Sequence, residues 1–410
     1  MLKKIFYTFV FSLYACVLIA NDSATKKPPM RLLMPIIRAE NFDFIERVPQ
    51  NTSVIFTVVN AYKNERLVIV PQALAIVENN GDTFELEYKI SISSTGKPTK
   101  VVAKDVYKNK IINKEFLTPL PFSLELVFEN SDSFGPYEIL LEAKNLTTGE
   151  SAKTTTVLNL IEWTTPSQIT DKKEFNKIFK NYNLRNNPQE LYALFVSPHS
   201  SFKDKKNNFA LTSFAFFKNA FLNHKFLLDL IAKEFPSYPQ ELRSKTIELF
   251  EMVGEGYKLN SLNDSEKKLQ KSMWDILSVI SKPSDVPHSP VELDVLWGEF
   301  FAKGNYTAIE KILNSIDAHS ANTLEFFKDN SALKTWNRKK QISSIVGFAG
   351  CWSMLSNCSA NELAKKYLFF ALNNFPKEKN QRINAVLKAT SEYIKQQNSA
   401  KKIKEPTKNQ

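Results

Sequence analysis

The stretch Thr83-Phe-Glu-Leu-Glu-Tyr-Lys-Ile-Ser-Ile92 alternates apolar and polar side chains. Because successive side chains of a β-strand point to opposite faces, this alternation predicts a strand with one buried and one polar face. The buried face would hold Phe84, Leu86, Tyr88, Ile90 and Ile92. The opposite face would hold Glu85, Glu87 and Lys89. A sheet that is polar on one side is typical of antiparallel architecture.

The two-residue period continues on both sides of this strand. Further strands are expected at Ser53–Val59, Arg66–Val70, Phe122–Phe128, Tyr137–Ala143 and Thr154–Ile161. Turn pairs such as Asn80-Gly81 and Thr95-Gly96 separate them. About seven or eight short strands with one polar face predict an antiparallel β-sandwich. We assign this domain to residues 30–163.

One part of this domain resembles a known module. The stretch Gly135-Pro-Tyr-Glu-Ile-Leu-Leu-Glu-Ala143, followed by a polar turn, resembles the late hairpin of bacterial immunoglobulin-like modules. The resemblance implies an immunoglobulin-like sandwich and no particular activity. It does not include the cysteine pair and buried tryptophan that mark antibody domains.

After Trp163 the hydrophobic period changes to that of a helix. Phe175, Ile178, Phe179 and Tyr182 recur at intervals of three and four residues, and later segments repeat this pattern. Prolines such as Pro188 interrupt it. The pattern predicts an all-α domain of about eight to ten helices over residues 167–395.

Two segments of this domain are similar to tetratricopeptide hairpins. The first holds Trp297, Phe300, Gly304, Ile309, Leu313 and Ile316, and the second holds Ala364, Leu368, Ala371 and Pro376. The offset from Ile309 to Ala364 is far longer than the family's repeat of roughly 34 residues. The similarity therefore implies helical hairpins but not a regular array. The segments 296–305 and 352–357 also resemble uncharacterised exported bacterial proteins, a likeness that implies export and no activity.

The N-terminus has the pattern of a secretory signal peptide over residues 1–20. Lys3 and Lys4 precede an uncharged run from Ile5 to Ala20, and a polar linker follows at residues 21–29. We therefore expect an exported protein, periplasmic or secreted. Two alternatives remain open: an uncleaved membrane anchor, and a lipoprotein attached through Cys16, which ends a lipobox-like Leu-Tyr-Ala-Cys.

The chain is basic, with 54 Lys and Arg against 43 Asp and Glu. Its lysines concentrate near the C-terminus, at Lys395, Lys401, Lys402, Lys404 and Lys408. We expect a disordered basic tail over residues 396–410, with peripheral contact to an anionic membrane surface as the alternative. Nucleic acid is not an expected partner, because no aromatic residue interleaves the tail and the chain is exported.

The sequence offers little catalytic chemistry. Its four histidines, His199, His224, His288 and His319, are not at metal-binding spacing, and no cofactor motif occurs. We thus expect no catalytic residue, metal or cofactor. His199 beside serines is expected to be an ordinary loop residue. Asp294 and Glu299 flank Trp297, but their spacing puts them on different faces of a helix.

Two residue groups remain as candidate sites. Trp297, Phe300, Phe301 and Trp352 form a possible aromatic interaction cluster, with a core wedge between helices as the simpler interpretation. Cys351 and Cys358 would be joined by a disulfide only if a helix broke between them, because two turns of one helix separate cysteines by about 10.5 Å. Otherwise they are free thiols.

These observations favour a non-enzymatic binding or scaffold protein of the bacterial envelope that mediates protein–protein interaction. Its expected partner is an unidentified envelope or secreted protein. The alternative is an enzyme or small-ligand-binding protein whose site lies between the two domains. A secreted effector is a third hypothesis, suggested only by the lysine- and asparagine-rich composition.

Overall fold

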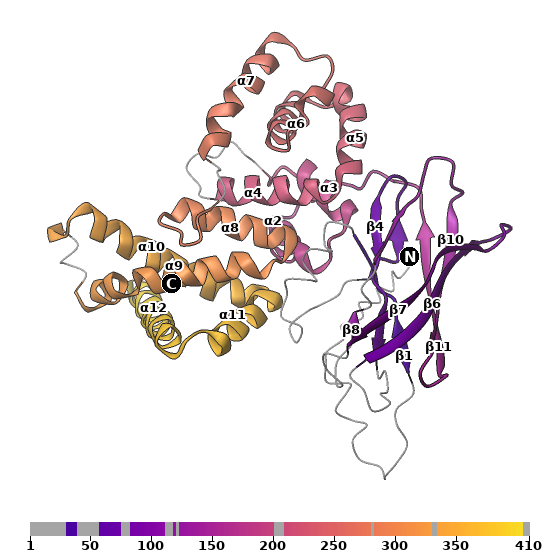
Figure 1. The fold of residues 1–410 in the computed structure, drawn as a ribbon. Helices are drawn as coiled ribbons and strands as arrows, with labels where there is room; N and C mark the ends of the chain where they lie inside the picture. Colours follow the sequence, from indigo (N-terminus) through magenta and orange to yellow (C-terminus); the bar gives the residue numbers. More distant parts are fainter. Residues whose placement is uncertain are drawn as a thin grey trace, which may run out of the picture. The chain divides into compact units, whose positions relative to one another are not determined.

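The computed structural model describes residues 30–38, 57–74, 83–110, 118–119, 123–200, 209–279, 283–329 and 334–404. The predicted signal peptide, the linker and residues 405–410 of the predicted tail lie outside these ranges. The chain forms two compact units that divide between Thr164 and Thr165. A β-rich N-terminal region is followed by an all-helical C-terminal region, as the change of period predicts (Figure 1).

The N-terminal unit contains three sheets. The five-stranded sheet has the order β3–β11–β10–β6–β7, and two three-stranded sheets have the orders β1–β5–β8 and β2–β4–β9. All strand pairs are antiparallel except β3 with β11. The strands are β1 (Arg31–Leu33), β2 (Ile36–Arg38), β3 (Asn60–Ala61), β4 (Arg66–Ile69), β5 (Gln72–Leu74), β6 (Thr83–Ser94), β7 (Lys100–Lys110), β8 (Thr118–Pro119), β9 (Leu124–Val127), β10 (Gly135–Asn145) and β11 (Ser151–Leu160).

The strand β6 confirms the predicted alternation. Leu86, Tyr88 and Ile90 are buried, whereas Glu85, Glu87 and Lys89 lie on the other, half-buried face. In the pairing of β6 with β7, an irregularity lies between Ile90 and Ser91, where Val102 of β7 has no partner. A bulge of this kind places an extra residue opposite one partner. The pairing of β6 with β10 stays regular at this point, with Ser91 opposite Leu140 and Ile92 opposite Ile139.

The hairpin of β10 and β11 forms the centre of the five-stranded sheet. Ten residue pairs join the two strands, from Gly135 opposite Leu160 to Lys144 opposite Ser151. Asn145 closes the turn by accepting hydrogen bonds from the backbone N–H groups of Thr147 and Thr148 through its side-chain oxygen. Gly149 then adopts φ +75°, which a side chain would strain. Buried apolar residues from each of the three sheets belong to one hydrophobic cluster.

The C-terminal unit contains eleven α-helices within the described residues. They are α2 (Lys172–Lys180), α3 (Pro188–Val196), α4 (Phe209–Leu222), α5 (Lys225–Glu234), α6 (Gln240–Met252), α7 (Asp264–Val279), α8 (Pro290–Lys303), α9 (Tyr306–Lys328), α10 (Arg338–Ala360), α11 (Glu362–Asn374) and α12 (Lys377–Lys404).

Local sequence sets the ends of these helices. Asn187 and Ser289 cap α3 and α8 with their side-chain oxygens, and each helix then begins with proline. Gly304 ends α8 in the left-handed conformation at φ +69°. One predicted boundary needs correction, because α12 is helical to Lys404 whereas the sequence placed the start of the tail at residue 396.

Of the two segments that are similar to tetratricopeptide hairpins, the first corresponds to α8–α9, and the second corresponds to α11 and the proline before α12. They are not consecutive, because the 23-residue helix α10 lies between them in the sequence. In space α10 packs against α9, α11 and α12 (Figure 1). Within the described ranges, no helix is both long and apolar enough to cross a membrane.

Candidate functional site

The helix α10 is apolar on two opposite faces. Its inner face buries Val346, Cys351 and Met354 against the neighbouring helices. On the other side, Ile345 and Trp352 each remain 52% exposed and Ile342 remains 42% exposed. Apolar residues on every side are typical of a helix that is covered all round. The exposed side of α10 is therefore an apolar surface that no described part of the chain covers.

The spacing of these residues places them on one stripe. Ile342, Ile345, Ala349, Trp352 and Ser356 follow each other at intervals of three and four residues, and we call this set the outer face of α10. From Gln341 to Asn361 the sequence contains no charged residue. The neighbouring helices α9, α11 and α12 all carry charged residues along their length. This uncharged run distinguishes α10 from them.

The inner face of α10 holds the helix close against α9. A Cβ atom added at Gly347 would lie 2.1 Å from Oγ1 of Thr323, and one at Gly350 would lie 3.0 Å from Cγ1 of Ile316. These glycines therefore permit an approach that no side chain would allow. At its start, Asn337 caps the helix by accepting a hydrogen bond from the Lys340 N–H at 2.9 Å. The outer face is thus presented by a firmly packed helix.

The predicted aromatic cluster is divided between the core and the surface. Trp297, Phe300 and Phe301 are buried, and the rings of Trp297 and Phe301 stack with centroids 5.6 Å apart. Phe301 also meets Phe179 of α2 edge-on. These three residues therefore form a core wedge between helices, which was the simpler interpretation of the aromatic residues in the sequence. Trp352 does not join them, because it lies on the exposed side of α10. The four residues therefore do not share one exposed surface, and of the four only Trp352 is exposed.

Both cysteines lie within the unbroken helix α10 and are free thiols. The disulfide considered from the sequence requires a helix break between them, but the break comes only after Ala360. The following helix α11 begins after Asn361, whose side chain accepts a hydrogen bond from the N–H of Ala364. The break between α10 and α11 therefore follows both cysteines and does not bring the thiols together.

The serine-rich turn around His199 is fixed by hydrogen bonds to the backbone. A ring nitrogen of His199, Nε2, lies 2.7 Å from the carbonyl oxygen of Thr170. Ser200 is fully buried, and its hydroxyl donates toward the carbonyl oxygen of Phe195 at 2.8 Å. Lys245 completes the turn by donating to Ser197 O at 3.1 Å and to Ser200 Oγ. A buried hydroxyl is a poor nucleophile for an external substrate, so this turn is a structural one.

Sequence reasoning missed Lys245, because it contacts this turn from 45 residues away. Burial lowers the pKa of its ammonium group to about 8, although the nearby carboxylates of Glu241 and Glu248 oppose the shift. The ammonium lies beyond the end of α3, where the carbonyl groups of the last turn lack helical partners. A cation near a helix C-terminus is electrostatically favourable. The position of Lys245 therefore stabilises the charged form of its side chain.

Asp294 and Glu299 do not form a carboxylate pair. Glu299 accepts a hydrogen bond from the side-chain amide of Asn305 at 2.6 Å. Asp294 lies in a different environment, where burial raises the pKa of its carboxyl group to about 7. Trp297 between them is buried, so no aromatic platform is open to a sugar. Among the described residues, no group of three His, Cys, Asp or Glu side chains is placed to hold a metal ion.

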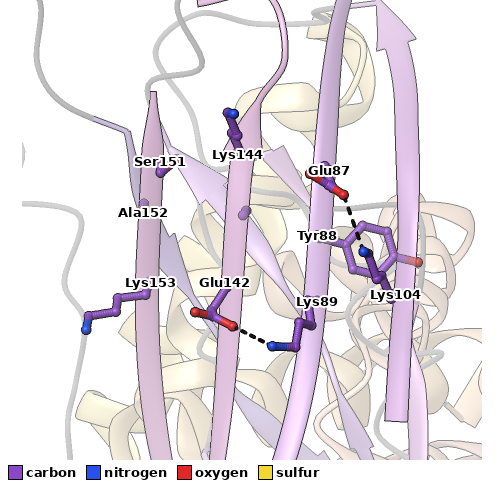
Figure 2. Close-up of a pocket in the computed structure, with 10 residues that line it drawn as sticks. Glu87, Tyr88, Lys89, Lys104, Glu142, Lys144, Ser151, Ala152 and Lys153 are labelled. Atoms are coloured by element: carbon purple, nitrogen blue, oxygen red, sulfur yellow. Dashed lines mark hydrogen bonds and ion pairs between the residues drawn. The ribbon is translucent and has the colours of Figure 1, made fainter. Parts of the chain in front are cut away.

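A hollow of about 500 Å³ lies on the five-stranded sheet, across β11, β10, β6 and β7. Figure 2 shows its two ion pairs, between Lys89 and Glu142 at 3.2 Å and between Lys104 and Glu87 at 3.7 Å. Two further lysines line it, Lys144 on β10 and Lys153 on β11. In the part of the chain that the structure describes, neither of these two makes an ion pair.

The hollow therefore has an excess of positive charge and is open to solvent. Its charged side chains stand on the exposed face of the sheet and pair mainly with each other (Figure 2). Catalytic sites instead place convergent polar groups in a concave, partly desolvated pocket. The hollow can attract an anionic group, but its geometry favours binding over chemistry.

Neither a scan against models of protein families nor a search of curated proteins found a match to this chain. The functional assignment consequently rests on the two surfaces described above, the outer face of α10 and the lysine-lined hollow.

Proposed function

We propose that this chain is an exported, non-enzymatic binding or scaffold protein of the bacterial envelope, and that its helical region binds a protein partner through the outer face of α10. The observation that carries the proposal is the exposure of Trp352 and Ile345 on a helix that is already packed on its other side. Contiguous exposed apolar residues mark interaction surfaces in soluble proteins. Tryptophan is also among the residues that contribute most to binding energy at protein interfaces.

We propose in addition that the N-terminal sheets form an immunoglobulin-like sandwich that serves as a recognition or spacer module. Two features support this arrangement. Buried residues from each of the three sheets share one hydrophobic cluster, as facing sheets require. The long hairpin of β10 and β11 corresponds to the stretch that resembles immunoglobulin-like modules. Circular dichroism of the isolated residues 30–164 would test whether this unit folds alone, as the proposed module should.

Export is supported by the N-terminal sequence, in which two lysines precede sixteen uncharged residues. The lysines beyond Lys395 support an additional peripheral contact with an anionic membrane surface. Expression of the full chain in a bacterium, followed by fractionation and mass analysis of its N-terminus, tests both points. A full-length cytosolic product would contradict export.

Binding to a partner is tested by cross-linking in living cells and recovery of the chain from envelope extracts. The variant Trp352→Glu should lose its specific cross-linked partner, because a charge on the outer face opposes burial of that face. The matched control is Val157→Glu, which changes a residue of similar exposure, 49%, on β11. Equal recovery of every partner by Trp352→Glu and the original chain would contradict the assignment of this face.

A second candidate function is the binding of an anionic ligand by the lysine-lined hollow. The four lysines of the hollow favour it, because they outnumber its two glutamates and leave a net positive charge that attracts an anionic ligand. Dextran sulfate is a suitable probe, and the double variant Lys144→Glu/Lys153→Glu should weaken its binding at low salt. Unchanged binding would exclude the hollow. A site between the two units, which the sequence suggested as an alternative, stays a prediction.

A further inference from the structure

The lysine-lined hollow is crossed by a row of charged side chains, one from each of its four strands. The register gives the order of this row as Lys104 (β7), Lys89 (β6), Glu142 (β10) and Lys153 (β11) (Figure 2). Because neighbouring strands are about 4.8 Å apart, the row extends over about 14 Å. Both of its ends are cationic, so a ligand that contacts both ends must carry several anionic groups along its length.

The row contains a repulsion that the fold does not need. Lys89 and Lys104 lie directly opposite each other on adjacent strands. Like charges in this arrangement destabilise a sheet. The ion pairs of these lysines with Glu142 and Glu87 reduce the repulsion, but each of the four side chains is at least 40% exposed. Exposed ion pairs contribute little to stability, so an anionic ligand can compete for both lysines.

A second row lies beside the first. Lys144 on β10 is opposite Glu87 on β6 and opposite Ser151 on β11. Lys153 is two residues from Ser151, so Lys144 and Lys153 are diagonal neighbours, which lie about 7–8 Å apart in a sheet. Two long side chains at this separation can contact the same anionic group. Ser151 is exposed beside them, and its hydroxyl group can donate a further hydrogen bond.

The glutamates of the hollow discriminate between kinds of anionic ligand. A carboxylate only accepts hydrogen bonds, and it repels other anions. A ligand that fills the hollow must therefore offer anionic groups to the lysines and hydrogen-bond donors to Glu87 and Glu142. A saccharide with sulfate, phosphate or carboxylate groups offers both, because its hydroxyl groups donate. A run of acidic side chains would instead bring more carboxylates against the two glutamates.

We propose that the lysine-lined hollow binds an anionic polysaccharide, whose charged groups lie along the row from Lys104 to Lys153 and whose hydroxyl groups donate to the two glutamates. This inference rests on the second candidate function, the binding of an anionic ligand, and names the class of that ligand. The hollow is open to solvent and crosses four strands, which suits a chain that continues beyond it. A small-molecule site would enclose most of its ligand.

The first test compares a heparin disaccharide with a heparin octasaccharide, by calorimetric titration of the full chain at low salt. The octasaccharide should bind at least about thirtyfold more tightly, because it can contact both ends of the row at once. Lys104→Gln and Lys153→Gln each remove one end and should each reduce this preference. The matched control is Lys97→Gln, which changes an exposed lysine in the turn between β6 and β7. Equal binding of the two oligosaccharides, or equal weakening by the control, overturns the proposal.

The second test uses the glutamates to separate a saccharide from other polyanions. Linear polyphosphate supplies negative charge but no sugar hydroxyl groups. Glu142→Leu removes a repulsion for both ligands, but it also removes an acceptor that the saccharide uses. The preference for heparin over polyphosphate should therefore fall by at least about threefold. An unchanged preference contradicts the hydroxyl contacts and overturns the assignment to a saccharide.

The inference and the function on which it rests can fail separately. If Lys144→Glu/Lys153→Glu weakens binding of dextran sulfate but the two heparin oligosaccharides bind alike, the hollow takes a single anionic group, and only the polysaccharide is overturned. If polyglutamate binds more tightly than heparin, the hollow belongs to an acidic protein segment, and again only the polysaccharide is overturned. If no anionic probe binds at low salt, both the inference and the second candidate function are wrong.

Discussion

The ammonium group of Lys245 donates a hydrogen bond to the carbonyl oxygen of Ser197 at 3.1 Å, beyond the C-terminal end of α3. It thereby connects α6 to the turn that follows α3, together with its contact to Ser200. The positive charge also lies 5.3 Å from the centre of the Phe195 ring, a favourable cation–π distance. A single buried cation thus joins two helices that are distant in sequence.

This cation predicts a defined pH dependence of stability. The pKa of Lys245 is about 8 in the folded protein, below the ordinary value of about 10.4. Between these values the unfolded chain binds more protons than the folded one, so the contribution of Lys245 to stability increases as pH rises. The free energy of unfolding of the original chain, relative to Lys245→Met, should increase by at most about 3 kcal/mol from pH 7 to pH 10.5. Urea unfolding measures it, and a constant difference would contradict the shift.

Asp294 predicts the opposite dependence. Burial raises its pKa from 3.8 to about 7 in the folded protein. Between these values the folded state binds more protons than the unfolded state, so stability falls as pH rises through 7. Asp294→Asn removes the ionisation and retains the shape. We expect the variant to be more stable than the original chain at pH 8, by at most about 4 kcal/mol, and to lose this advantage near pH 4. Thermal unfolding at both pH values measures this difference, and an equal advantage of the variant at pH 4 and pH 8 would contradict the shift.

The sequence predicted the local pattern of the β-rich region well, because a sheet that is buried on one face has strands in which apolar and polar residues alternate. In β6 the alternation identified Leu86, Tyr88 and Ile90 as buried. It could not predict the bulge at Val102 of β7, since this depends on the register between β6 and β7. Nor could it predict that the short strand β3 pairs in parallel with β11, a contact between segments about a hundred residues apart.

The helical period predicted the helices equally well. It does not show, however, which apolar residues lie on the surface of the packed helices. Periodicity identifies the apolar faces of a helix. When a helix such as α10 has two apolar faces, periodicity does not show which of them is buried. Trp297 and Trp352 therefore looked alike in the sequence, although one is in the core and the other on the surface. The uncharged run from Gln341 to Asn361 was the available signal for an exposed apolar face.

Gly347 lies where α10 packs closely against α9, so a substitution at this position tests how close the two helices are. Alanine normally stabilises a helix interior relative to glycine by about 1 kcal/mol. At Gly347 the added Cβ would meet Oγ1 of Thr323 at 2.1 Å and Cβ of His319 at 3.0 Å. Gly347→Ala should therefore destabilise the protein by about 1–3 kcal/mol, as overpacking does.

Chemical denaturation measures this change, with Ser356→Ala on the outer face as the control. The control should change stability by less than about 0.5 kcal/mol, because surface substitutions away from packed contacts have small effects. If Gly347→Ala changes stability no more than Ser356→Ala does, or if it stabilises the protein, then α10 and α9 are further apart than in this structure.

The thiols of Cys351 and Cys358 should be almost unreactive in the folded protein. Burial raises the pKa of each to about 12, and the thiolate is the form that reacts. At pH 8 alkylation by iodoacetamide should therefore be slower than that of an ordinary cysteine by on the order of a thousandfold. In guanidinium chloride both thiols should react at once, since the shift belongs to the folded state.

Intact-mass measurement after alkylation under denaturing, non-reducing conditions counts the free thiols directly. Both cysteines should be labelled in full, and dithiothreitol should leave the unfolding transition unchanged, because a continuous helix holds the sulfur atoms two turns apart. A fraction that is protected until reduced, or a midpoint that falls with dithiothreitol, would require α10 to break between Cys351 and Cys358. Such a break would also remove the straight outer face of α10 on which Ile345 and Trp352 lie, so this measurement bears on the proposed protein-binding face as well.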